Sequence, residues 1–138
     1  LTITSASTFA ANCPININQN TQGYWLSQDE PGWTSAETTP THIKLLTEHF
    51  GGAVFSPKLA RLACVYQTTA GQWLALVSNQ HSGIHIDQNA TDNKGNKVWQ
   101  WSNEHQDYSC GQPLVKSSSG CPFSISPSHK TYSNQVSF

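Results

Sequence analysis

Residues 60–79, ARLACVYQTTAGQWLALVSN, are the segment that most restricts the fold of this chain. Two runs rich in strand-forming residues flank the short turn TTAG, which supplies a glycine. Alternation along the first run places Leu62, Cys64 and Tyr66 on one face. The segment therefore predicts a central antiparallel β-hairpin.

The second run of this hairpin contains Trp73, one of five tryptophans. Trp73, Ala75 and Val77 share one face of this run, and Leu74 and Leu76 share the other. The chain has no Met and few Phe, so large aromatic side chains must fill much of the interior. We therefore expect Trp73 to belong to the core.

Further short segments with strand-like alternation are separated by turn residues. One or two strands are expected within residues 13–33, and DYSCG (107–111) is another. A second hairpin is expected from GIHID (83–87), through a turn at 92–97, into KVWQWS (97–102). Short, closely spaced strands are typical of mostly-β domains. The prediction is a small antiparallel β-sandwich, or a curled sheet or open barrel, linked by two disulfides.

Residues 41–50 fit either a helix or a strand. Ile43, Leu46 and Phe50 recur at helical spacing, Thr41 is a possible cap, and the two glycines that follow would end a helix. The same glycines would equally allow a strand to bend. The spacing alone slightly favours a short helix.

The chain of 138 residues suits one domain, and no repeat or linker divides it. We expect a single secreted β-domain over residues 1–138. Residues 1–12 are expected to form an edge strand or a flexible arm, and residues 124–138 an extended tail.

Composition points to export and excludes two classes of partner. Charged residues make up 11% of the chain, against about 25% in average proteins, and a surface rich in hydroxyls and amides is common in secreted β-proteins. A net charge of −1 offers no basic field for nucleic acid or anionic lipid. No run approaches the ~18 apolar residues that span a membrane. Because Met is absent, we expect that a signal peptide has been removed.

The four cysteines permit three disulfide pairings. Cys13–Cys64 together with Cys110–Cys121 is the simplest, because it links the N-terminal segment to the hairpin and closes a short polar loop. Each bond would add roughly 2–4 kcal/mol of stability. A zinc site lacks the usual CxxC or His spacing, and nothing nearby marks a catalytic thiol.

A series of short motifs runs along most of the chain. They are Cys13-Pro14, GYW and GW within 23–33, FGGAVFSP and KLARLACVYQ over 50–67, AGQWLALV at 70–77, a late Trp, DYSC at 107–110 and GCPF at 120–123. Through their order, over roughly residues 13–123, the chain resembles a family of small secreted proteins of unknown function from gammaproteobacteria such as Legionella and Pseudomonas. The resemblance implies export, for example as a Legionella type II secretion substrate, and a β-fold. It also favours an extended conformation for HIKLLTEHFGGAVF, and it assigns no catalytic or binding residue.

Exposed tryptophans are the main candidates for a binding surface. Trp99 and Trp101 lie two positions apart, so they would share one face of a strand. We expect at least one of them to belong to the core, and Trp101, nearer the polar end SNEH, to be the one with an edge in solvent. Trp25 and Trp33 flank the turn DEPG, so we expect at least one of them to be exposed. An exposed indole can contact a sugar ring while neighbouring polar side chains bond its hydroxyls. The candidate binding residues are Trp33, Trp99, Gln100, Trp101, Asn103, Glu104 and His105.

Residues suited to catalysis are sparse. The chain contains no GxSxG, HExxH, P-loop or GxGxxG motif. The carboxylate pairs Asp29 with Glu30 and Glu104 with Asp107 fall in a turn and a polar loop, whereas a glycosidase places two carboxyls across a cleft. We therefore expect no enzyme activity, no cofactor and no metal.

Three functions remain, in decreasing order of preference. The first is a secreted, non-enzymatic module that binds a glycan or a host or other extracellular surface. The alternative is a protein-interaction effector or protease inhibitor that presents the Cys110–Cys121 loop, since a constrained loop loses little entropy on binding. The least favoured is a metal-dependent enzyme using His81, His85 and Asp87.

Overall fold

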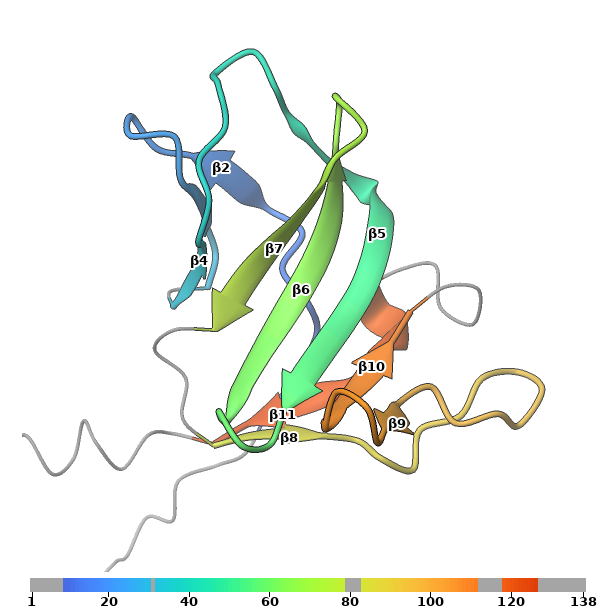
Figure 1. Ribbon diagram of the computed structural model, residues 1–138. Helices are drawn as coiled ribbons and strands as arrows, with labels where there is room; N and C mark the ends of the chain where they lie inside the picture. Colours follow the sequence, from blue (N-terminus) through green and yellow to red (C-terminus); the bar gives the residue numbers. More distant parts are fainter. Residues whose placement is uncertain (1–8, 31, 79–82, 112–117, 127–138) are drawn as a thin grey trace, which may run out of the picture.

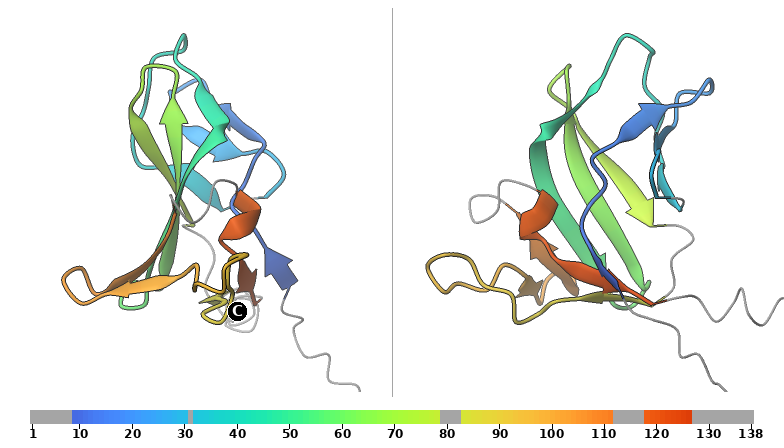
Figure 2. Two further views of the ribbon diagram at one scale, coloured as in Figure 1. Left: turned by 90° about the vertical axis from the view of Figure 1, so that its right-hand side faces the viewer. Right: turned by 180° about the vertical axis from the view of Figure 1, so that it is seen from behind.

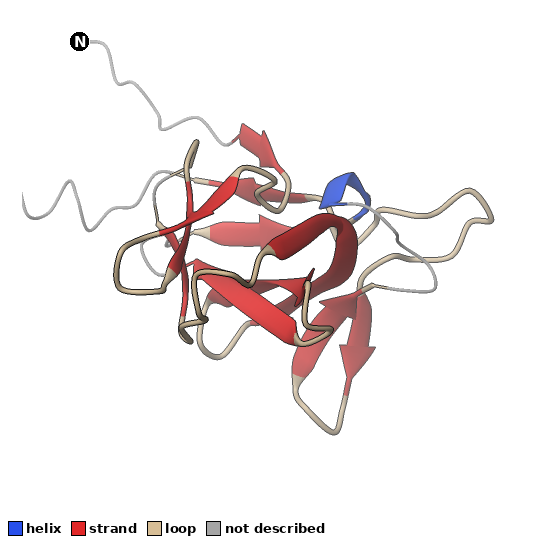
Figure 3. Cartoon of the chain, turned by 90° about the horizontal axis from the view of Figure 1, so that it is seen from above, coloured by secondary structure: helices blue, strands red, loops and turns tan. Residues whose placement is uncertain are grey.

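The computed structural model describes residues 9–30, 32–78, 83–111 and 118–126 (Figure 1). The strands in these ranges are β1 (Phe9–Ala11), β2 (Ile17–Gln19), β3 (Trp25–Ser27), β4 (Trp33–Ser35), β5 (Leu45–Ser56), β6 (Arg61–Thr68), β7 (Trp73–Ser78), β8 (Ile84–Ile86), β9 (Gln100–Ser102), β10 (Asp107–Cys110) and β11 (Phe123–Ile125). The only helical turn in the described ranges is η1 (Ser118–Gly120), shown in blue in Figure 3. A helix able to span a membrane is not found within these ranges.

The strands form two antiparallel sheets. The larger has the order β2-β3-β4-β7-β6-β5-β10-β9, and the smaller has the order β1-β11-β8. Strands β2 and β4 lie over one face of β5, β6 and β7, and β11 and η1 lie on that same side (Figure 2). The end strands β2 and β9 do not pair, so the sheet curls without closing. The predicted mostly-β, curled antiparallel fold is confirmed.

The predicted central hairpin is formed by β6 and β7. Tyr66 pairs with Leu74 and Cys64 pairs with Leu76, and all four side chains are buried. Trp73 lies on the opposite face of β7 and is 56% exposed, so the expectation of a core position was wrong. The two leucines, rather than the tryptophan, face the core. The Trp73 indole instead lies against Gly51 of β5, where an added Cβ would approach the ring to 2.6 Å.

Residues 45–56 form strand β5, so the short helix that the spacing of Ile43, Leu46 and Phe50 predicted was wrong. β5 pairs with β6, and its register shifts between Leu46 and Phe50 and again between Phe50 and Gly52. Such bulges break the two-residue alternation of a strand. This irregularity explains why the apolar residues of β5 imitate helical spacing.

The predicted second hairpin is not formed. β8 pairs with β11, and β9 pairs with β10. The turn at 92–97 closes only an isolated bridge between Thr91 and Lys97. Strand alternation indicated that these segments extend, but it carries no information about a partner as distant in sequence as β11. The predicted strand DYSCG is confirmed as β10.

The one or two strands expected within residues 13–33 are confirmed as β2 and β3, and β4 begins at Trp33, the last residue of that range. Trp25 in β3 and Trp33 in β4 are both buried, so the expectation that one would be exposed was wrong. The Trp33 ring packs against Phe123 of the smaller sheet, with centroids 6.0 Å apart, and so joins the two sheets. Strand β1 is an edge strand within the predicted arm; residues 1–8 and 127–138 lie outside the described ranges.

Both predicted disulfides are present. Cys13 is bonded to Cys64 of β6, and Cys110 of β10 is bonded to Cys121. All four cysteines are buried, with exposed fractions of 3% or less. The first bond holds the segment before β2 against the inner face of the large sheet. The second connects the larger sheet to the segment that leads into β11.

Candidate binding site

The β9–β10 hairpin carries most of the predicted binding residues. Trp101 belongs to β9, and Asn103, Glu104 and His105 lie in the turn between the two strands. All four side chains are exposed, and Trp101 retains 44% of its surface. The structure therefore brings these four predicted residues together at one end of the molecule, beside β10 in Figure 1.

Neighbouring side chains fix the orientation of the Trp101 ring. Its Nε1–H donates a hydrogen bond of 2.9 Å to Oδ1 of Asn103. The centroid of its ring lies 4.9 Å from the centroid of the Tyr108 ring, and the two ring planes are inclined by 59°. The Tyr108 hydroxyl in turn lies 3.5 Å from Oε1 of Gln88. We call Trp101, Tyr108, Asn103 and Gln88 the Trp101 surface.

The exposure of Trp101 follows from its place in the sheet. Trp101 pairs with Tyr108, which pairs with Phe55 of β5, which pairs with Leu62 of β6. These four residues form one row on the inner face. Leu62 is completely buried, Phe55 and Tyr108 are partly buried, and Trp101 is exposed because β9 is the end strand. The row passes continuously from core to surface.

Three predicted binding residues belong neither to the Trp101 surface nor to the adjacent turn that carries Glu104 and His105. Trp33 and Trp99 are buried, with 1% and 3% of their surfaces exposed, so they cannot serve as binding platforms. Trp99 lies before β9, and its Nε1–H donates a hydrogen bond of 2.9 Å to the Pro122 carbonyl. Gln100 is exposed, but it precedes Trp101 on the same strand and so points to the opposite face.

Tyr108 and Gln88 are the members of the Trp101 surface that sequence reasoning missed. DYSC was identified as a strand, and a hairpin between it and QWS would have paired Tyr108 with Trp101. Because KVWQWS was instead paired with GIHID, the pair of Trp101 with Tyr108 was not predicted. Gln88 follows β8 and is close only because of the tertiary fold, so no local signal pointed to it.

The remaining candidates gain little from the structure. His85 and Asp87 are exposed, and His81 lies outside the described residues. Within those residues, no group of three or more His, Cys, Asp or Glu side chains is arranged to hold a metal ion. The Cys110–Cys121 bond is present, but residues 112–117 of its loop are also outside the described ranges.

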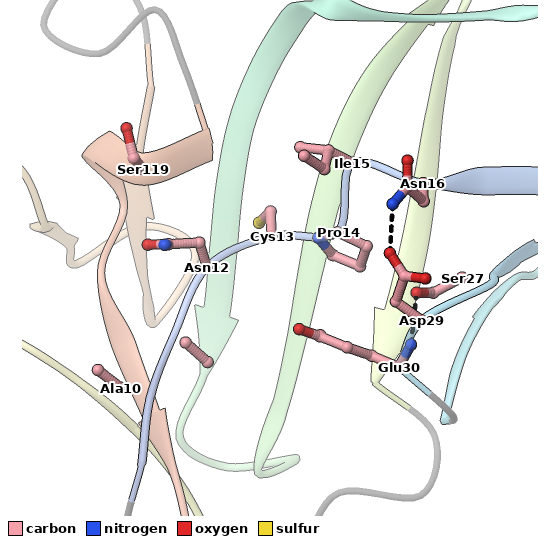
Figure 4. Close-up of a pocket in the computed structure, with 11 residues that line it drawn as sticks. Ala10, Asn12, Cys13, Pro14, Ile15, Asn16, Ser27, Asp29, Glu30 and Ser119 are labelled. Atoms are coloured by element: carbon pink, nitrogen blue, oxygen red, sulfur yellow. Dashed lines mark hydrogen bonds between the residues drawn. The ribbon is translucent and has the colours of Figure 1, made fainter.

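A hollow of about 420 Å³ lies between the N-terminal segment and residues 27–30 (Figure 4). It is lined by Ala10, Ala11, Asn12, Cys13, Pro14, Ile15, Asn16, Ser27, Asp29, Glu30 and Ser119. The Asn16 side-chain amide donates a hydrogen bond to the Asp29 carboxylate. The Glu30 backbone N–H donates to Oγ of Ser27 at 3.1 Å. The Glu30 side chain reaches across towards Pro14, as Figure 4 shows.

Tyr66 lies next to this hollow, beneath the N-terminal segment. Its hydroxyl donates a hydrogen bond to the Pro14 carbonyl, and its side chain is fully buried. Burial raises the pKa of Tyr66 far above its ordinary value, and the negative charge of Glu30 raises this pKa further. The phenol therefore stays protonated in the folded protein.

This raised pKa predicts a loss of stability in alkali. Unfolded tyrosine ionises near pH 10, whereas folded Tyr66 keeps its proton. The folded state therefore binds more protons above pH 10, and the free energy of unfolding falls as pH rises through that region. Urea unfolding at pH 8 to 11 should show a steeper fall for the natural chain than for Tyr66→Phe. Equal slopes for the two proteins would contradict this assignment.

No protein-family model, curated protein or solved structure matches this chain.

Proposed function

We propose that the protein is a secreted, non-enzymatic binding module that recognises a glycan through the Trp101 surface. The observation that carries this proposal is the exposed Trp101 indole held beside Tyr108 and Asn103. Two aromatic rings offer faces to the C–H groups of a sugar. The neighbouring Asn103 and Gln88 amides, with Glu104 and His105 in the adjacent turn, supply hydrogen-bonding groups for its hydroxyls.

The arrangement of the Trp101 surface favours binding because it is already ordered. The indole is oriented by its bond to Asn103 and by its contact with Tyr108, both of which involve residues of the same hairpin. A side chain that is fixed before binding loses less entropy when the ligand arrives. The exposed, mixed aromatic and amide character suits a neutral, hydroxyl-rich ligand on a host or other extracellular surface.

Two features support an extracellular setting and a role without catalysis. The protein has two disulfides, and disulfides persist in oxidising compartments such as the extracellular space. The carboxylates of the hairpin, Glu104 and Asp107, lie at the surface and outside the lining of the hollow. Glycoside hydrolysis instead needs two carboxyls facing each other across a bound sugar. Export, including type II secretion, is part of this proposal.

Trp101→Ala tests the proposal. A glycan array should identify an oligosaccharide that binds the natural chain, and tryptophan fluorescence should measure its affinity. Because a central aromatic contact is worth about 2 kcal/mol or more, Trp101→Ala should weaken binding about thirty-fold.

Two variants serve as controls for this experiment. Trp73→Ala removes an exposed indole from the other face of the sheet, and Gln100→Ala changes the opposite face of β9. Both should bind the oligosaccharide as the natural chain does. An array without hits, or full binding by Trp101→Ala, would remove the basis for a glycan site here.

A further inference from the structure

We propose that the hollow of Figure 4 is a second binding site, which accepts an organic cation of the alkylammonium class. A lysine side chain and a free aliphatic amine share this chemistry. The site is built from residues 10–16 with Ser27, Asp29, Glu30 and Ser119, and it contains no residue of the Trp101 surface. A test of this second site therefore does not depend on whether the Trp101 surface binds a glycan.

The charge of the hollow selects a cation. Of the eleven residues that line it, Asp29 and Glu30 are acidic, and none is Lys, Arg or His. The neutral polar residues Asn12, Asn16 and Ser27 add oxygen atoms that can accept hydrogen bonds from an ammonium group. An anion would meet two carboxylates and no compensating cationic side chain from the lining.

The Glu30 carboxylate has an oxygen atom that a ligand could bind. Its Oε2 atom is buried and has no hydrogen-bond partner among the described residues. A buried carboxylate oxygen without a partner is costly, because it has lost its water and gained nothing in return. In Figure 4 this side chain extends into the hollow towards Pro14. An ammonium group there would provide both a hydrogen bond and an opposite charge.

The size and walls of the hollow favour an organic cation over a metal ion. A volume of about 420 Å³ falls in the range of small-molecule sites. Ala10, Ala11, Pro14 and Ile15 form an apolar part of the wall, against which a methylene chain can pack. The described residues offer no group of three or more acidic, His or Cys ligands for a metal. A charged head on a hydrocarbon stem matches both parts of the lining.

Two amine probes and two uncharged analogues test the site in the full chain. The amines are n-pentylamine and Nα-acetyl-lysine methylamide, and the analogues are 1-pentanol and Nα-acetyl-norleucine methylamide. In a ¹⁵N NMR titration, an amine should shift the backbone amides of Asn16, Asp29 and Glu30 with a Kd of about 1 mM or lower. Added salt should weaken this binding, and the uncharged analogues should not saturate.

Variants separate a charge-selective site from adventitious contact. Glu30→Gln keeps the shape of the side chain and should weaken amine binding about tenfold or more. Asp29→Asn should weaken it as well and provides a second variant if Glu30→Gln does not fold. Glu37→Gln, at an exposed carboxylate outside the hollow, and Trp101→Ala should leave amine binding unchanged.

The results distinguish a lysine side chain from a free amine as the ligand, and they decide whether the site binds amines at all. Tighter binding of the lysine derivative would support a peptide side chain as ligand, and equal binding of both amines would support a free amine. The proposal is overturned if neither amine saturates, if the uncharged analogues bind as tightly, or if folded Glu30→Gln and Asp29→Asn bind unchanged. It is also overturned if calcium chloride shifts the same amides and the amines do not.

Discussion

Gly52→Ala is expected to lower the free energy of unfolding by roughly 3–5 kcal/mol. Gly52 has a φ of +113°, a conformation that residues with a Cβ rarely adopt. An added Cβ would lie 2.2 Å from the Cys110 carbonyl oxygen and 2.8 Å from the Gly111 Cα. Both are backbone atoms, so the overlap cannot be relieved by a rotamer change. The β5–β10 pairing must shift, and it supports both a disulfide and the Trp101 surface.

Gly95→Ala is the matched control for this substitution. Gly95 also has a positive φ, of +84°, but a Cβ there would meet no atom within 4 Å. Its replacement should therefore show backbone strain alone, about 1–2 kcal/mol. Urea unfolding measures the free energy of unfolding of both variants. The larger loss in Gly52→Ala is the contribution of the close contact between Gly52 and Cys110 of β10. If the two variants lose equal stability, the close approach at Gly52 does not matter energetically.

The same glycine illustrates what the sequence could and could not predict. FGGAVF indicated a helix end or a bend in a strand, and the bend is what occurs. The local hairpin of β6 and β7 was predictable because its turn and both runs adjoin in sequence. The pairing of β8 with β11 joins segments about forty residues apart, and alternation within each strand is identical for every possible partner.

Alternation also leaves open which face of a strand turns inward. Trp73 and Leu74 lie on opposite faces of β7, and both faces of this strand are apolar. The choice depends on the other layer, since β2 and β4 lie over one face of the sheet (Figure 2) and the Cys13–Cys64 bond links the segment before β2 to β6. Leu74 is buried and Trp73 is exposed. Exposure of Trp101 was predictable because polar residues follow it directly. Burial of Trp33 was not, because its partner Phe123 comes from the other sheet.

The hollow has the same origin in tertiary structure. In the sequence, Asp29 and Glu30 fall in the turn DEPG, and nothing there indicates a neighbour from the N-terminal segment. They face residues 10–16 because Cys13 is bonded to Cys64 and the Tyr66 hydroxyl donates a hydrogen bond to the Pro14 carbonyl. Both contacts lie more than fifty positions away along the chain. No local pattern could therefore have placed an acidic pair beside the N-terminal segment.

Removal of the Cys13–Cys64 bond is the second change with a large expected effect. The Cys13→Ala, Cys64→Ala variant opens a loop with a sequence separation of 51. The loss of this constraint on the unfolded chain should cost about 4 kcal/mol. A domain of this kind has roughly 5–15 kcal/mol of total stability, so little would remain at the lower end of that range. Denaturant unfolding under oxidising conditions measures the loss.

The Cys110→Ala, Cys121→Ala variant provides the comparison, because all four cysteines are similarly buried. Its loop has a sequence separation of only 11, so the same reasoning gives about 3 kcal/mol. The two variants should also differ in amine binding. Loss of Cys13–Cys64 releases the wall of the hollow formed by residues 10–16, whereas the other bond lies outside that wall. A larger stability loss in the Cys110 and Cys121 variant would show that loop closure is not the main source of stabilisation.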